Sequence, residues 1–90
     1  MSDQLLVALA RATAQLVAAI DLTDDEEVDP DLASGWFEGV AAEFDQLGDE
    51  DRRKLADLIR QAAAEERNPK FRAAMLAIPE SFGLEDEEDG

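Results

Sequence analysis

The chain has 90 residues, of which 23 are acidic and 8 basic, giving a net charge of −15, and it contains neither cysteine nor histidine. This length suits a single domain with a small core. The missing cysteines exclude disulfides and thiolate metal sites, and the missing histidines remove the commonest metal ligand and proton shuttle. The negative charge disfavours nucleic acid and anionic membranes as partners, and it favours basic proteins.

Charge is unevenly distributed along the chain. Residues 1–51 carry 14 acidic residues and 1 basic residue, residues 52–72 carry 3 acidic and 7 basic, and residues 73–90 carry 6 acidic and none basic. The middle segment is therefore a basic island in an acidic chain. The acidity either serves an interaction with a basic protein or only keeps the protein soluble, and the sequence leaves both interpretations open.

The first predicted element is a helix over residues 3–20, made of good helix formers. At 100° per residue, one apolar stripe predicts the face that packs on the core. It comprises Leu5, Leu9, Thr13, Leu16 and Ile20. Because polar residues are few elsewhere on this helix, a second face should be buried in a homodimer or against a partner. That predicted oligomer interface comprises Val7, Ala14 and Ala18.

The same segment is apolar enough to be mistaken for a signal peptide. Asp3 stands where a signal peptide has basic residues, and Arg11 interrupts its centre. No other stretch approaches the run of uncharged apolar residues that spans a bilayer. We therefore expect a cytoplasmic protein.

A second helix should follow an acidic connection over residues 21–29. Asp29 is the expected N-cap, Pro30 occupies the first helical position, and Gly48 marks the end. Apolar residues at helical spacing predict the aromatic centre of the core. They are Leu32, Trp36, Phe37, Val40, Phe44 and Leu47.

Two further helices complete the prediction. The third begins with Asp49 as its cap and ends before Pro69, and the fourth starts at Asn68-Pro69 and ends at Pro79. Their expected core residues are Leu55, Leu58, Ile59 and Ala62 in the third helix and Phe71, Met75 and Ile78 in the fourth. Phe82 and Leu84 should then fold back onto the core.

These elements predict an all-α fold, a small four-helix bundle over residues 3–84. No segment alternates at period two over the length of a strand, and no internal repeat is visible. Residues 85–90 are expected to form an acidic, disordered tail.

The available side chains argue against an enzyme, a cofactor or a dedicated metal site. Without histidine or cysteine the serine and threonine hydroxyls have no evident base, and Lys54 and Lys70 sit in no Ser-x-x-Lys pattern. A calcium-binding loop beginning at Asp21 would have Glu26 in place of the turn glycine and Leu32 in place of the bidentate glutamate. Weak association of this loop with a divalent cation stays open.

Two stripes of charge recur every seven residues on the second and third helices. The acidic stripe is Asp31, Glu38 and Asp45, and the basic stripe is Arg53, Arg60 and Arg67. An antiparallel hairpin would set them in matching order, but at 100° per residue both stripes point largely outward, beyond each other's reach. The acidic stripe is therefore predicted to be a docking surface for a basic partner, together with the neighbouring small residues Gly35, Gly39 and Ala42.

The two glycines carry a separate prediction. Glycine is unfavourable inside a helix, so Gly35 and Gly39 are most simply explained by a close crossing with another helix.

Size, acidity and four helices are shared with acyl carrier proteins, but their Asp-Ser-Leu motif fails here, because Ser34 lies inside a predicted helix. The chain also resembles small acidic immunity-type proteins of bacteria and uncharacterised actinobacterial helical proteins. The resemblance lies in its size, its acidity and its ending, Asn68-Pro69 followed by Pro79-Glu80-Ser81-Phe82-Gly83-Leu84. It implies protein binding and defines no functional residue.

The predicted function is an interaction protein that binds a basic protein partner and either neutralises it, as an immunity-type inhibitor does, or scaffolds it. One alternative is a structural homo-oligomer, a homodimer for example, that uses the helix over residues 3–20 as its interface. Another is a nucleic-acid mimic whose carboxylates imitate phosphates.

Overall fold

The computed structural model describes residues 3–84, which form four helices: α1 (Asp3–Asp21), α2 (Pro30–Asp45), α3 (Asp49–Glu65) and α4 (Pro69–Ser81). The described residues contain no strand, so the predicted all-α fold, a small four-helix bundle, is confirmed. The acidic tail predicted over residues 85–90 lies outside the described residues.

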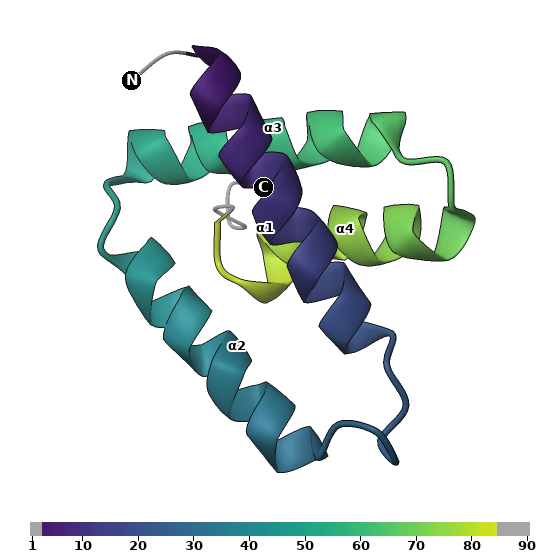
Figure 1. The fold of residues 1–90 in the computed structure, drawn as a ribbon. Coiled ribbons are helices and arrows are strands. Elements are labelled where there is room, and N and C mark those ends of the chain that lie inside the picture. The colour runs from purple at the N-terminus through teal and green to yellow at the C-terminus, as the bar shows by residue number, and fades with distance from the viewer. Residues whose placement is uncertain (1–2, 85–90) are drawn as a thin grey trace.

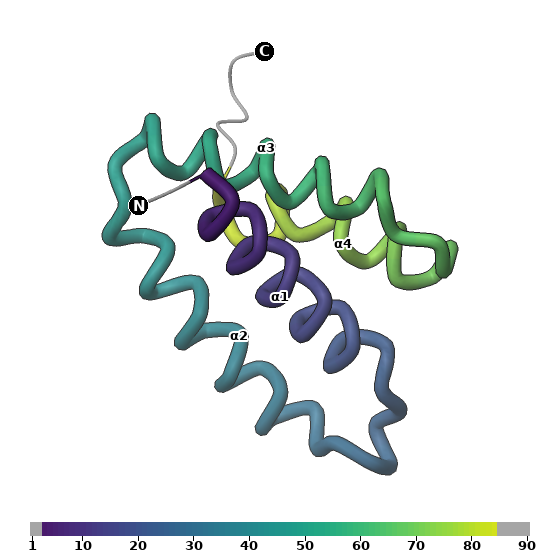
Figure 2. The backbone as a smooth tube through the Cα atoms, turned by 45° about the horizontal axis from the view of Figure 1, so that its top comes forward, coloured from purple at the N-terminus to yellow at the C-terminus, as the bar shows by residue number. Residues whose placement is uncertain are grey.

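The helices divide into a packed group of three and one outlying helix. α3 and α4 lie side by side in opposite directions, and α1 crosses both of them (Figure 1). α2 ends beside the start of α3, lies apart from the other three helices along the rest of its length and contacts them least (Figure 2). The core lies where α1, α3 and α4 meet. Its buried hydrophobic residues are Ala10, Ala14, Val17, Ala18, Ala56, Ile59, Ala62, Ala63, Met75, Ile78, Phe82 and Leu84.

Alanine supplies three of the four buried residues of α1 and three of the four buried residues of α3, two helices that contact each other. Ala14, Ala18 and Ala63 are completely buried. The distance between two packed helices depends on the side chains between them, so small residues allow a close crossing. At the edge of this contact, Arg11 of α1 forms an ion pair with Glu65 of α3.

α1 packs with a different face from the predicted one, although Thr13 and Ile20 of the predicted face are half-buried. Leu5, Leu9 and Leu16 are 47%, 51% and 64% exposed, whereas Ala14 and Ala18 are fully buried within the chain. The predicted oligomer interface is therefore wrong for these two alanines, which have no surface left to contribute, and Val7 beside them is half-buried. α1 is apolar nearly all round, so its periodicity allowed two inner faces, and the face with the smaller residues, which permit a closer approach of α3 and α4, is the one buried.

By length and composition alone, α1 is also the one helix in the described residues that could cross a membrane. The core helix of a soluble protein and a signal sequence have the same properties. In this structure the buried side of α1 is the alanine-rich face that packs on α3 and α4.

The predicted helix starts are largely confirmed by their caps. The Asp29 side chain accepts a hydrogen bond from the N–H of Asp31 at 2.8 Å. The Asn68 side chain accepts from the N–H groups of Lys70 and Phe71 at 2.9 and 3.2 Å. α3 begins one residue earlier than predicted. Its N-cap is Gly48, which is extended, and the predicted cap Asp49 is already the first helical residue.

The end of α4 returns the chain to the core. Gly83 has φ of +69°, which favours glycine. Its N–H donates to the Glu80 carbonyl at 3.3 Å, and the N–H of Leu84 donates to the Pro79 carbonyl at 2.8 Å. This pair of bonds is a Schellman motif, and it buries Phe82 and Leu84 as predicted. The prediction that Pro79 ends the helix is wrong by two residues, because α4 continues to Ser81. Pro79 is compatible with the Schellman motif, since it contributes its carbonyl oxygen as an acceptor and no N–H group.

Candidate functional site

α2 is held to the rest of the protein by one narrow face. None of its 16 residues, all of which the structure describes, is buried. The rings of Phe37 and Phe44 lean on Phe82, with centroid distances of 5.7 and 6.0 Å. Leu32 and Trp36, predicted to lie in the core, are largely exposed. The predicted aromatic centre is confirmed in part: Phe37, Val40 and Phe44 pack against the core from its outer side. The prediction is wrong for Leu32 and Trp36, and the buried ring is Phe82.

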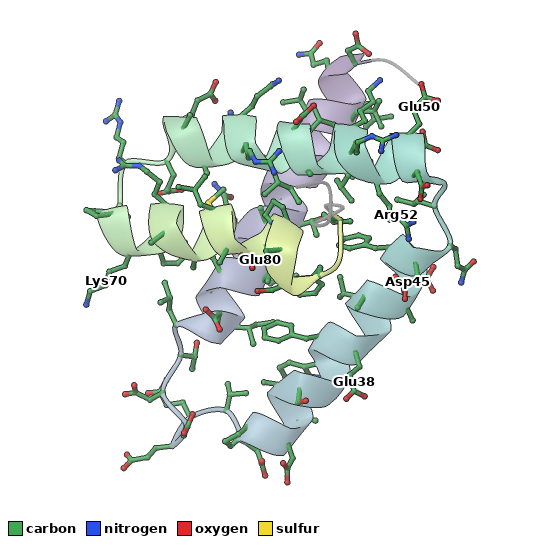
Figure 3. All side chains as sticks on the ribbon, turned by 180° about the vertical axis from the view of Figure 1, so that it is seen from behind. Glu38, Asp45, Glu50, Arg52, Lys70 and Glu80 are labelled. Atoms are coloured by element: carbon green, nitrogen blue, oxygen red, sulfur yellow. The ribbon has the colours of Figure 1, made fainter. Side chains whose placement is uncertain are left out.

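The predicted docking surface lies on the exposed side of α2. All six of its residues are exposed: Asp31, Gly35, Glu38, Gly39, Ala42 and Asp45. Figure 3 shows Glu38 and Asp45 along this helix, with their carboxylates at the surface. α2 carries four acidic residues and no basic residue. The structure thus brings the predicted residues together as one open acidic face.

The glycines of this face do not mark a crossing within the protein. A Cβ added to Gly35 or Gly39 would meet no described atom within 4 Å. The predicted close crossing is therefore wrong, because α2 is the outermost helix and has no neighbour on this side. The glycines and Ala42 instead leave the backbone of α2 accessible.

The acidic and basic stripes do not form a ladder between α2 and α3. Asp45 approaches Arg52 at 3.9 Å, and Arg60 pairs with Asp57 of its own helix at 3.1 Å. Arg53 and Arg67 are exposed. The acidic stripe points outward, as predicted, and remains available to another molecule.

The basic residues, Arg11 apart, lie on one part of the molecule and leave the α2 side purely acidic. Seven acidic residues fall within residues 21–31, which form the end of α1, the connection and the start of α2. Every basic residue except Arg11 falls within residues 52–72, on α3, α4 and the turn between them, where seven acidic residues of the range 49–81 balance the seven basic ones. The α2 side therefore attracts cations, and a basic partner would be steered toward it.

A cavity of about 460 Å³ opens beside the acidic face and was not predicted from the sequence. It lies between the end of α1, the following connection, α2 and the end of α4, so it joins Asp21 to Phe82. The acidity of the connection over residues 21–29 was the one feature of the sequence that drew attention to residues of this cavity. Within residues 3–84, no three acidic side chains gather closely enough to hold a metal ion.

Comparisons of the chain with models of protein families, with curated proteins and with solved structures find no match. The resemblance to immunity-type proteins therefore stays a prediction. What this molecule offers a partner is the acidic face of α2, the cavity beside it and the exposed leucines of α1.

Proposed function

We propose that the protein is an interaction module that binds a basic protein partner on the outer face of α2. The observation that carries this proposal is an exposed helix face with carboxylates and no cation, in a chain with a net charge of −15. Complementary charge accelerates association and selects the partner. Gly35, Gly39 and Ala42 support the proposal, because small residues allow a partner to approach closely.

Neutralisation of the partner, as by an immunity-type inhibitor, is the more specific form of this proposal. It is supported by the small size and acidity of the chain and by the resemblance of its ending to such proteins. An inhibitor of this kind acts by covering a basic surface, which requires complementary charge and no catalytic group.

Affinity capture from the native host, followed by mass spectrometry, tests the proposal with three baits: the wild type, Glu38→Lys and Glu50→Lys. Both variants change the net charge from −15 to −13, since one negative charge becomes positive, but Glu50 lies at the start of α3 (Figure 3). A basic protein retained by the wild type and Glu50→Lys, but lost by Glu38→Lys, supports the α2 face. A partner retained equally by all three baits overturns it.

The salt dependence of the association rate then shows whether Glu38 acts through long-range attraction of the partner. Glu38→Lys should slow association strongly at low salt and weakly at high salt, because salt screens exposed charges. Its melting temperature should stay close to that of the wild type, because Glu38 is exposed.

One observation favours a second candidate function, a homo-oligomer formed through α1. Leu5, Leu9 and Leu16 share one exposed stripe of this helix. Leu9 also lines an apolar cavity of about 410 Å³ beside Phe44 and Leu47. Size-exclusion chromatography with light scattering tests it: a dimer that dissociates in Leu16→Glu supports an α1 interface, and a wild-type monomer at all concentrations overturns it.

A further inference from the structure

The cavity beside the acidic face has an apolar wall. The rings of Phe37 and Phe82 meet nearly edge to face at 5.7 Å on this wall, and Val28 and Ala33 extend it. Its volume of about 460 Å³ lies within the range of about 300–1,000 Å³ typical of ligand pockets. The cavity is therefore large enough for a long side chain together with the backbone that bears it.

The rim of the cavity is acidic. Asp21, Asp25 and Glu38 contribute three carboxylates from α1, the connection and α2, and the described lining includes no lysine or arginine. Hydroxyl groups of Thr23, Ser34 and Ser81 also line it. The Thr23 hydroxyl donates to the Ala19 carbonyl at 2.6 Å, so its oxygen remains an acceptor. The cavity thus presents negative charge and hydrogen-bond acceptors above an aromatic wall.

We infer that this cavity receives one arginine side chain of a basic protein partner. An arginine offers five N–H donors, stacks on aromatic rings and sheds water more readily than an ammonium group. Its stem would lie against Phe37 and Phe82 while its guanidinium reached the carboxylates. The inference rests on the proposed function, because Glu38 belongs both to the acidic face and to the cavity wall. A buried arginine is also a frequent anchor of protein interfaces.

Other occupants fit this chemistry less well. A metal ion would need converging carboxylates, and no such group occurs within residues 3–84. A second copy of the chain also has a net charge of −15, so it would be repelled by the acidic rim. A lysine is a compact, strongly hydrated cation with fewer donors, so it uses the aromatic wall and the dispersed acceptors less fully.

The test is an NMR titration of the full-length protein with the tripeptide acetyl-Gly-Arg-Gly-amide. Amide shifts should concentrate at Phe37, Glu38 and Phe82. The matching citrulline peptide, which has a similar shape but no charge, should bind at least about tenfold more weakly. Asp25→Asn should weaken binding of the arginine peptide about threefold, as for a partly exposed ion pair. Asp24→Asn, one residue away and outside the lining, should leave it unchanged.

Equal binding of the arginine and citrulline peptides, shifts confined to other surfaces, or equal effects of the two aspartate variants would each overturn the inference. A lysine peptide that binds as tightly as the arginine peptide would overturn the choice of arginine. If a captured partner is lost by Glu38→Lys while the arginine peptide produces no shifts at the cavity, the docking face stands and the cavity proposal falls. If the peptide binds in the cavity but a captured partner ignores Glu38→Lys, the proposed function falls and the cation site stands.

Discussion

The ring of Phe82 meets the ring of Phe37 at 5.7 Å and an interplanar angle of 73°, which joins a buried residue beyond α4 to the outlying helix α2. Phe44 contacts the same ring at 6.0 Å. Both rings of α2 that contact another aromatic ring do so at Phe82, which is therefore one anchor of this helix. The position of the acidic face thus depends on a residue that lies outside α2.

Replacing this anchor should destabilise the protein strongly. Phe82→Ala should lower the free energy of unfolding by about 3–5 kcal/mol, as for other buried phenylalanines. Urea denaturation followed by circular dichroism measures it. Leu76→Ala, at a half-exposed position of α4, is the control and should change stability by less than about 0.5 kcal/mol. Similar losses in the two variants would contradict the role of Phe82.

The inner face of α1 can be tested with a reciprocal pair of variants. Ala14→Leu places extra atoms at a fully buried position of α1 and should cost about 1–3 kcal/mol. Leu16→Ala removes a mostly exposed side chain and should stay within about 0.5 kcal/mol of the wild type. Thermal unfolding of both variants decides which face is buried, and the opposite ranking would restore the leucine face as the inner one.

Glycine replacements should have opposite effects at two places in the chain. Gly35→Ala adds a methyl group that meets no described atom, so it should stabilise α2 by about 0.5–1 kcal/mol. Gly83→Ala must adopt a positive φ and should cost about 1–2 kcal/mol. Chemical denaturation measures both changes. A destabilising Gly35→Ala would contradict the open space beside this position.

Added sodium chloride should raise the melting temperature. Repulsion within a chain of net charge −15 weakens as the Debye length falls from about 10 Å at 0.1 M salt to about 3 Å at 1 M. Differential scanning calorimetry measures the rise, and the double variant Asp24→Asn, Glu27→Gln should show a smaller one. A melting temperature that falls with salt would mean that attractive pairs such as Arg11–Glu65 outweigh the repulsion.

Hydrogen exchange should distinguish α2 from the other helices. Segments with little buried apolar surface open locally at low free energy. The amides of α2 should therefore exchange faster than those near Ile59 in α3 and Met75 in α4, both fully buried. Equal protection across the four helices would show that α2 opens only when the whole protein unfolds.

The sequence predicts the local parts of this fold well. Asp29-Pro30 and Asn68-Pro69 locate two helix starts, because capping depends on neighbouring residues alone. The packing face of α1 could not be predicted, because both of its faces are apolar and the choice depends on which helix approaches it. The position of α2 also depends on a distant contact, that with Phe82.

The candidate site divides in the same way. The outward direction of Asp31, Glu38 and Asp45 follows from a seven-residue spacing on one helix, so the sequence predicts it. The cavity was missed because it joins Asp21 to Phe82, two residues that no local pattern relates.

The outlying position of α2 has a consequence for how specificity can change. Asp31, Glu38 and Ala42 are exposed and contribute little to the core, so substitutions there should change the free energy of unfolding only slightly. Such variants should stay above the minimum stability that function requires. Relatives or engineered versions could therefore exchange these residues for others and acquire a different partner while α1, α3 and α4 stay unaltered. A change of partner in this protein would therefore require substitutions in α2 alone and would leave the packed core unchanged.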